Sequence, residues 1–365
     1  MSPRARIGVI GAGWWATSYH LPALVRHPRA EVVAVVDTDA RKAEVAARRN
    51  GIPVWFTDHR RLLETSVDGV VVATPHDTHF ALARDALEAA VDVLVEKPMV
   101  IEPEHGRELV RLAHERGRRL HVGYPFPHTR HAQLLRELVG EGRLGTVLTA
   151  TGVFATSVLP LYRGTVDSTM DVSEGTLWPT GSETYSSPTR GGGQLLTQVT
   201  HSASLLLFLS GLRPHSVFCH SDDYDTKVDV WDGIVFKSGS GAVGTITSTG
   251  TVAHHEQRVE EYRVFGSEGH ALLDTRGGTL RVDLYDARRT IEPPPLEAHE
   301  IYPAHAPATR LVDSIVDDAP VVATGELGLL TVELLAAARS SSRAAAPVTL
   351  ELDEAPATAA SGGTP

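Results

Sequence analysis

Residues 7–16, with the sequence IGVIGAGWWA, decide the fold of the first part of this chain. A short apolar run of strand length leads directly into a G-x-G-x-x-A turn, after which a helix is expected. Gly11 permits the tight turn, Gly13 lets the backbone approach a pyrophosphate, and Ala16 lets the helix pack closely on the strand. The N-terminal end of that helix favours negative charge. The stretch therefore predicts a dinucleotide-binding turn.

Asp37 indicates which dinucleotide this turn is expected to bind. It follows the second predicted strand, at about the spacing at which an acidic residue meets the ribose hydroxyls. A carboxylate there favours NAD and repels the additional phosphate of NADP, and residues 38–40 contain no arginine. The alternative is that Asp37 or Asp39 caps the next helix. We expect NAD to be bound by the turn, including Trp14 and Trp15, and by Asp37.

The first third of the chain alternates strand-length apolar runs with helical patterns, which is typical of a parallel βαβ sheet. The expected strands are Ile7–Ile10, Val32–Val36, Val54–Phe56, Gly69–Ala73, Val93–Val95 and Leu120–Val122. Helices are expected over His79–Ala90 and from Pro103 to Gly117, with proline near the start and glycine at the end. We predict an α/β Rossmann domain over residues 1–124.

After residue 125 the pattern changes to longer alternating strands, which predicts an α+β domain over 125–350 with a large, mostly antiparallel open sheet. The clearest strands are Thr146–Ala155, Asp232–Phe236, Gly244–Ser248 and Tyr262–Phe265. An irregular segment, Thr156–Arg190, is expected to close over a ligand. A helix over 326–343 is expected to pack back toward the first domain, and residues 352–365 to be disordered.

Composition narrows the class of protein. The chain has 365 residues, of which 42% are hydrophobic and 22% charged, so two globular domains are expected. A net charge of −11 argues against nucleic acid as a partner. The single cysteine, Cys219, suits a reducing compartment and excludes a cysteine-based metal site. Neither a signal peptide nor an apolar run of membrane-spanning length is present, so we expect a cytoplasmic protein without a metal.

Two further motifs carry a family resemblance. Residues 74–79, TPHDTH, and 96–98, EKP, both follow predicted strand ends, where an open α/β sheet binds ligands. Together with Gly123-Tyr124 and the glycine run 191–193 before a helix, they resemble the Gfo/Idh/MocA family of glucose-fructose oxidoreductase and inositol dehydrogenase. The resemblance covers most of the chain. It implies cofactor contacts at Thr74, Pro75, His76, His79, Glu96 and Lys97.

The resemblance also implies the catalytic residues. Lys97 matches the lysine that lies beside the nicotinamide and the substrate hydroxyl, where a cation can stabilise alkoxide character. His201 matches the histidine that accepts the proton, for which an imidazole is well suited near neutral pH. The family's aspartate is replaced by Thr197, so we expect Thr197 or Gln198 to orient His201 through a neutral contact.

A second departure follows Tyr124, where the chain reads Pro-Phe-Pro-His. Tyr124 is expected near the substrate, with core packing as the alternative. The expected substrate-binding residues are Lys97, Tyr124, Tyr185, Thr197, Gln198 and His201.

The resemblance implies NAD-dependent oxidation or reduction of a secondary ring hydroxyl of a sugar, glycoside or cyclitol, and residues 191–211 favour glycosides oxidised at ring carbon 3. The alternatives are an enzyme that keeps NAD bound while it cleaves glycosides through transient oxidation, and a non-catalytic NAD sensor. We expect a homo-oligomer, dimer or tetramer, formed through the C-terminal sheet.

Overall fold

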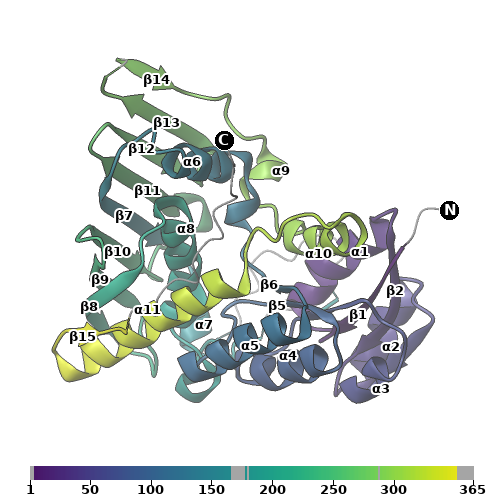
Figure 1. Ribbon diagram of the computed structural model, residues 1–365. Coiled ribbons are helices and arrows are strands. Elements are labelled where there is room, and N and C mark those ends of the chain that lie inside the picture. The colour runs from purple at the N-terminus through teal and green to yellow at the C-terminus, as the bar shows by residue number, and fades with distance from the viewer. Residues whose placement is uncertain (1–3, 166–176, 179–180, 287, 352–365) are drawn as a thin grey trace, which may run out of the picture.

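The computed structural model describes residues 4–165, 177–178, 181–286 and 288–351 (Figure 1). The tail predicted to be disordered, 352–365, lies outside the described residues, as do 166–176 and 179–180 of the predicted covering segment. Within that segment the described residues include a short helix, α7 (Leu159–Tyr162), and a 3₁₀ turn, η4 (Pro188–Arg190).

The N-terminal sheet has the predicted parallel Rossmann topology. Its strands are β1 (Ala5–Ile10), β2 (Ala30–Val36), β3 (Val54–Phe56), β4 (Gly69–Val72), β5 (Asp92–Val95) and β6 (Leu120–Val122). They pair in parallel in the order β3-β2-β1-β4-β5-β6. The order reverses between β1 and β4, and in this fold ligands bind outside the carboxyl ends of the strands at such a reversal.

Helices connect these strands. They are η1 (Ala16–His20), a π-helical turn, followed by α1 (Leu21–Arg26), α2 (Ala40–Arg49), α3 (His59–Leu63), η2 (His76–Thr78), α4 (His79–Glu88) and α5 (Pro103–Arg116). The predicted punctuation of α5 is confirmed, because proline occupies its first position and Gly117 ends it in the left-handed conformation.

The C-terminal sheet is nine-stranded and mostly antiparallel, as predicted. Its strands are β7 (Val147–Ala155), β8 (Pro214–Asp222), β9 (Trp231–Ser238), β10 (Val243–Thr249), β11 (Val259–Gly266), β12 (Gly269–Asp274), β13 (Thr279–Leu284), β14 (Arg289–Ile291) and β15 (Val348–Thr349). The order is β14-β13-β12-β11-β7-β10-β9-β8-β15. The pair β7–β10 is parallel, and the other pairs of described strands are antiparallel.

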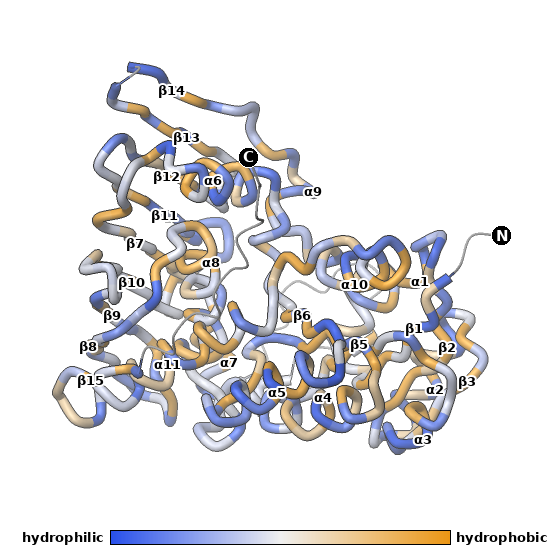
Figure 2. Tube along the Cα trace, viewed as in Figure 1, coloured by the Kyte–Doolittle hydropathy of each residue, from blue (hydrophilic) through white to orange (hydrophobic). Residues whose placement is uncertain are grey.

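One face of this sheet is covered by α6 (Arg130–Gly140), α8 (Thr200–Ser210) and α11 (Gly325–Ala344) (Figure 1). Nearly every residue of α8 is buried, and Figure 2 shows it among the hydrophobic segments. Such a helix is a central core element rather than an amphipathic surface helix. Shorter turns complete the domain: η3 (Phe126–His128), η5 (Leu195–Val199), η6 (His255–Gln257) and α9 (Ala298–Ile301).

Two late helices join the domains. Helix α11 contacts α5 of the first domain as well as α8 and β8, so it lies against both domains. Helix α10 (Ala306–Asp317) also returns, and packs on α1 and on the parallel strands. No sequence pattern predicted this second return, because amphipathic spacing shows that a helix has a buried face but not which sheet covers it.

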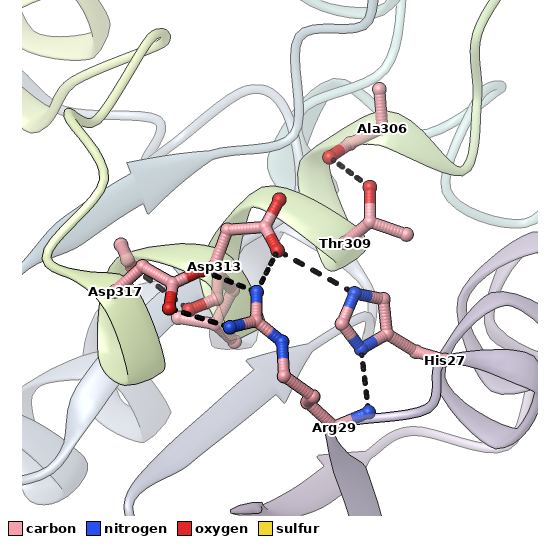
Figure 3. Close-up of polar contacts among 8 residues, drawn as sticks. His27, Arg29, Ala306, Thr309, Asp313 and Asp317 are labelled. Carbon is pink, nitrogen blue, oxygen red and sulfur yellow. Dashed lines mark hydrogen bonds and ion pairs between the residues drawn. The ribbon is translucent and has the colours of Figure 1, made fainter. Parts of the chain in front are cut away.

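Ion pairs fix α10 at the start of β2 (Figure 3). The Arg29 guanidinium donates to Asp313 Oδ1 at 3.2 Å and forms a two-pronged contact with the Asp317 carboxylate. His27 Nε2 lies 3.5 Å from the same Asp313 oxygen. Paired contacts of this kind add geometric specificity, whereas burial of apolar residues of α10 supplies most of the stabilisation.

Asp232 is a buried acid inside the C-terminal domain, and it leads to a stability prediction. Its side chain on β9 is 2% exposed, and neither carboxylate oxygen has a hydrogen-bond partner among the described residues. Burial, with the nearby charge of Asp229, raises the pKa of Asp232 well above 3.8. The folded state therefore binds a proton that the unfolded chain releases, so this group costs stability as the pH rises above about 4.

We expect Asp232→Asn to be increasingly more stable than wild type as the pH rises. The difference in unfolding free energy should grow by about 1.4 kcal/mol per pH unit until the pKa of folded Asp232 is passed. Urea denaturation at a series of pH values from 4 to 8 measures it. A difference that stays constant across this range would show that Asp232 is ionised in the folded protein. Asp223→Asn, at an exposed position, is the control and should show no such trend.

Candidate functional site

The dinucleotide turn has the predicted geometry. Gly11 has φ +102°, and a Cβ atom there would lie 2.2 Å from the Ala73 carbonyl oxygen. Only glycine fits that position. Gly13 faces open space, because nothing lies within 4 Å of the place where its Cβ would be. A tight turn beside an open space, at the head of a helix, fits the pyrophosphate of a dinucleotide.

Asp37 lies at this turn, and the capping alternative belongs to Asp39. Asp37 Oδ2 accepts a hydrogen bond from the Ala12 amide at 2.8 Å, and its Oδ1 accepts one from the Asp39 amide at 2.9 Å. The Asp39 side chain caps α2 by accepting from the Arg41 and Lys42 amides. The Asp37 carboxylate is thus fixed at the end of β2 and partly exposed, where ribose hydroxyls are bound in this fold.

An aromatic cluster stands over the turn. The Trp15 ring lies 4.3 Å from the ring of Tyr19 and 5.4 Å from that of Trp14, measured between centroids. Both tryptophans are partly exposed. On the other side, Trp15 meets Tyr302 of the second domain with centroids 6.3 Å apart. The cluster therefore forms a wall between the cofactor turn and the C-terminal domain.

The segment after β4 contains Thr74, Pro75 and His79, which are expected to contact the cofactor. Thr74 and Pro75 lie at the strand end, and the Thr74 hydroxyl is 2.7 Å from that of Thr78. His79, however, is 0% exposed, with Nδ1 2.8 Å from the Pro98 carbonyl and Nε2 2.9 Å from the Thr74 carbonyl. His79 therefore connects the two strand-end loops, and its contact with the cofactor stays a prediction.

His76 connects the two domains. Its Nδ1 lies 2.9 Å from the carbonyl oxygen of Gly191, at the glycine run that precedes η5. Burial lowers the pKa of His76 well below 6.5, so the ring is neutral and donates this hydrogen bond. Tyr185 lies against it, with ring centroids 6.4 Å apart, and its carbonyl accepts from the Gly193 amide. Burial also raises the pKa of Tyr185 to about 12.

Lys97 lies just after the end of β5 and is partly buried. Its Nζ donates to the Thr197 carbonyl oxygen of the second domain at 3.2 Å. Burial lowers the pKa of Lys97, while the neighbouring Glu96 carboxylate opposes that effect. Glu96 is buried as well, and its contacts with His20 and Lys97 outweigh burial, so the pKa of Glu96 is lowered. The lysine thus has an anionic partner held out of water.

His201 lies in the first turn of α8, in the second domain, within electrostatic reach of Lys97. It is 6% exposed and enclosed by aromatic rings, with centroid distances of 6.1 Å to Phe126, 6.3 Å to Phe154 and 6.5 Å to Tyr302. Burial, and then the charge of Lys97, lower the pKa of His201 well below 6.5. Its imidazole is therefore neutral at pH 7, the form that can accept a proton.

The expected orientation of His201 by Thr197 or Gln198 is wrong for the described residues. The Thr197 hydroxyl donates to the Gly193 carbonyl at 2.7 Å and lies 2.8 Å from the Tyr162 hydroxyl. No side-chain hydrogen bond joins Gln198 to His201, whose Nδ1 is buried without a partner within the described ranges. The π-helical turn η5 places Thr197 away from His201, because the regular spacing of an α-helix does not hold through it.

Tyr124 packs in the core of the first domain, where it is 1% exposed, and its hydroxyl lies 3.0 Å from that of Thr200. Burial raises the pKa of Tyr124 to about 12, so it stays protonated at neutral pH. Its ring centroid lies 6.4 Å from that of His201. Tyr124 therefore packs as the alternative expected, and its contact with the substrate stays a prediction.

Three site residues were not predicted from the sequence. His20 contacts Glu96, Tyr302 closes the aromatic wall, and the Tyr162 hydroxyl donates to Gln194 at 2.7 Å beneath Thr197. Each is brought to the site by contacts between residues far apart along the chain. A polar His20 on the buried side of the first helix was the single visible hint.

Fold and site together define a class: a two-domain dinucleotide-binding protein in which a partly buried lysine of the first domain acts electrostatically on a buried histidine of the second. The chain belongs to the Gfo/Idh/MocA family, as its motifs predicted. Residues 5–124 match the family's NAD-binding Rossmann fold, and residues 132–272 match its C-terminal domain. The N-terminal domain is thus an NAD-binding domain.

Several relatives resemble the chain. It is 29% identical to dTDP-3,4-didehydro-2,6-dideoxy-α-D-glucose 3-reductase of Saccharopolyspora spinosa over 75% of this chain and 76% of that protein. It is 33% identical to D-glucoside 3-dehydrogenase of Escherichia coli over 40% and 42%. GenD2 from gentamicin A biosynthesis, solved with NAD, has 25% identity and a TM-score of 0.78 over 96% of this chain and 98% of GenD2. Two other curated relatives are matched over about two fifths of their length, 39% and 42%.

The described helices include none that is both long and apolar enough to cross a bilayer. Within the same residues, no group of three or more His, Cys, Asp or Glu side chains is arranged to hold a metal ion.

Proposed function

We propose that this protein oxidises or reduces a secondary ring hydroxyl of a sugar, glycoside or cyclitol with NAD. One observation carries the proposal: a partly buried lysine directly after β5 donates, across the domain boundary, to the turn that leads into a buried histidine. The charge of Lys97 acts on His201, so the two groups lie within electrostatic reach of each other.

The roles follow from charge and burial. The Lys97 ammonium binds the hydroxyl oxygen and stabilises the negative charge that develops on it. Neutral His201 accepts the hydroxyl proton through the ring nitrogen that is free to face the substrate. Gly11, Gly13, Trp14, Trp15 and Asp37 would hold NAD, together with Thr74, Pro75 and His76. When bound, NAD supplies the hydride acceptor.

Oxidation at ring carbon 3 is the position we favour. Two relatives act at that carbon by name, the glucoside 3-dehydrogenase and the dTDP-sugar 3-reductase. The site contains the partly exposed aromatic residues Trp14 and Trp15, which suit the apolar face of a pyranose ring.

The test is a panel of sugars, glycosides and inositols incubated with the enzyme and NAD, with NADH absorbance and product analysis as the measurements. We expect NADH formation with at least one glycoside or cyclitol and a 3-keto product. Release of aglycone without net NADH would favour the NAD-retaining cleavage alternative. NAD binding without turnover on the whole panel would favour the sensor.

Asp37 should decide between NAD and NADP. We expect Asp37→Ser to weaken NAD binding by about tenfold or more, because the variant loses charged hydrogen bonds to the ribose. NADP binding should be unchanged or improved, because the variant no longer repels the additional phosphate of NADP. Calorimetric titrations of both nucleotides measure the ratio. Asp39→Ser is the matched control, since serine can still cap α2 and the change should leave the ratio as in wild type. An unchanged ratio in Asp37→Ser would contradict the assignment.

We also propose that the protein forms a homo-oligomer through the C-terminal sheet. The face of that sheet opposite α6, α8 and α11 exposes Val153 on β7 and Val235 on β9, each about two fifths exposed. Light scattering should give the mass of a dimer or tetramer, reduced to a monomer in the Val153→Glu/Val235→Glu variant. Val54→Glu, equally exposed on the Rossmann domain, is the control. A monomeric wild type would contradict the proposal.

A further inference from the structure

His20 is a buried histidine that contacts the acid beside the proposed catalytic lysine. It is 0% exposed, and its Nε2 lies 2.7 Å from Glu96 Oε1. The other oxygen of Glu96 accepts the Lys97 amide at 3.1 Å. Because an ionised carboxylate only accepts hydrogen bonds, the proton of the short contact belongs to His20 Nε2. His20 thus donates a charge-assisted hydrogen bond from the helix that follows the dinucleotide turn.

Gly123 leaves space for the Glu96 carboxylate. A Cβ atom on Gly123, which directly follows β6, would lie 2.5 Å from Glu96 Oε1 and 3.0 Å from Oε2. Any side chain at position 123 would therefore displace the carboxylate. Two elements distant in sequence, η1 and the end of β6, converge on the position of one buried acid.

Glu96 is the negative charge that favours the ammonium form of Lys97. Burial lowers the pKa of Lys97, and Glu96 is the anion that opposes it. The other titratable groups facing this pair are His76 and His79 beside β4, His201 on α8, and the phenols of Tyr124, Tyr185 and Tyr302. The histidines bring no negative charge, and the phenols have raised pKa values and stay neutral. The ammonium form of Lys97 therefore depends on an ionised Glu96.

We propose that His20 is a positioning residue that keeps Glu96 ionised and aimed beside Lys97, so that the first helix of the NAD-binding domain sets the charge of the lysine. Without its donor, a buried carboxylate binds a proton more readily and loses its power to hold a cation nearby. The consequence for catalysis rests on the proposed function, in which Lys97 acts as a cation. The coupling between His20 and Lys97 does not depend on the proposed function.

The sequence permits a direct test, because the chain contains four lysines: Lys42, Lys97, Lys227 and Lys237. Lysine labelled with ¹³C at Cε gives one titrating NMR signal for each, and Lys97→Arg identifies the Lys97 signal by its loss. The full chain is titrated without substrate. We expect Glu96→Gln and His20→Leu to lower the pH midpoint of Lys97 by about one pH unit or more. His20→Gln, which keeps a donor near the position of Nε2, should restore most of the wild-type midpoint.

The other three lysines are internal controls for folding and should titrate as in wild type. If His20→Leu does not fold, Gly123→Ala displaces the same carboxylate and should lower the Lys97 midpoint in the same direction. A Lys97 midpoint equal to wild type in the folded His20→Leu or Gly123→Ala variant overturns the proposal. Lowered midpoints together with no oxidation of any sugar would leave this coupling standing and reject the proposed function alone.

Discussion

We expect His201→Ala to lower turnover by about a hundredfold to ten-thousandfold while the affinity for NAD stays nearly unchanged, since that is the usual contribution of a general base. The imidazole packs against Phe126 and Phe154, which are not part of the turn of Gly11 and Gly13, so we expect its removal to leave that turn intact. Steady-state kinetics at saturating NAD, on a substrate found in the panel, and calorimetric NAD binding are the measurements.

The pH dependence separates a base from a structural residue. Burial lowers the pKa of His201 well below 6.5, so the neutral, active form persists as the pH falls and is lost only below that value. Wild type should therefore keep its activity at pH 6.5 and lose it at lower pH, and His201→Ala should lack this acidic limb. His131→Ala, which removes another buried histidine, is the control. If His201→Ala keeps most activity and the same limb, His201 is structural and Lys97 becomes the candidate proton acceptor.

Lys97→Ala should be at least as damaging as His201→Ala. It removes the cation that stabilises developing alkoxide character, a contribution that is large in a site shielded from water. Turnover should fall more than the Michaelis constant rises, because the interaction strengthens in the transition state. Lys42→Ala, which changes a partly exposed lysine on α2, is the control.

The double variant tests whether the two residues act together. If Lys97 and His201 act on one hydroxyl group, Lys97→Ala/His201→Ala should be little worse than the more damaged single variant. Losses that multiply would show that the two side chains contribute to different steps. A fully active Lys97→Ala variant would reject the proposed mechanism.

The fold of the first domain could be predicted because its signals lie in short stretches of neighbouring residues. A glycine with φ > 0 at Gly11, an alternation of apolar runs with helical spacing, and Gly117 at a helix end are each properties of a few neighbouring residues. The motifs after β4 and β5 could be placed for a related reason, because the carboxyl ends of parallel strands always meet at one edge. The sequence therefore sufficed to place Asp37 and Lys97.

The sequence could not show which partners hold three of the predicted site residues. The polar atoms of His79, Tyr124 and Thr197 contact the Pro98 carbonyl, the Thr200 hydroxyl and the Tyr162 hydroxyl. A one-dimensional pattern shows which residue stands at a position and not which partner satisfies it. Buried polar atoms take whichever partner the packing provides.

By itself the sequence determined the Rossmann sheet, the mostly antiparallel second sheet, the NAD turn and the presence of a lysine and a histidine of suitable chemistry. Only the tertiary structure decided that His20 donates to Glu96, that Tyr302 meets Trp15, and that Lys97 reaches Thr197. These contacts join residues of different elements or domains. Their geometry is fixed by how α10, α11 and the two sheets pack, which depends on the summed burial of many side chains rather than on any local run of residues.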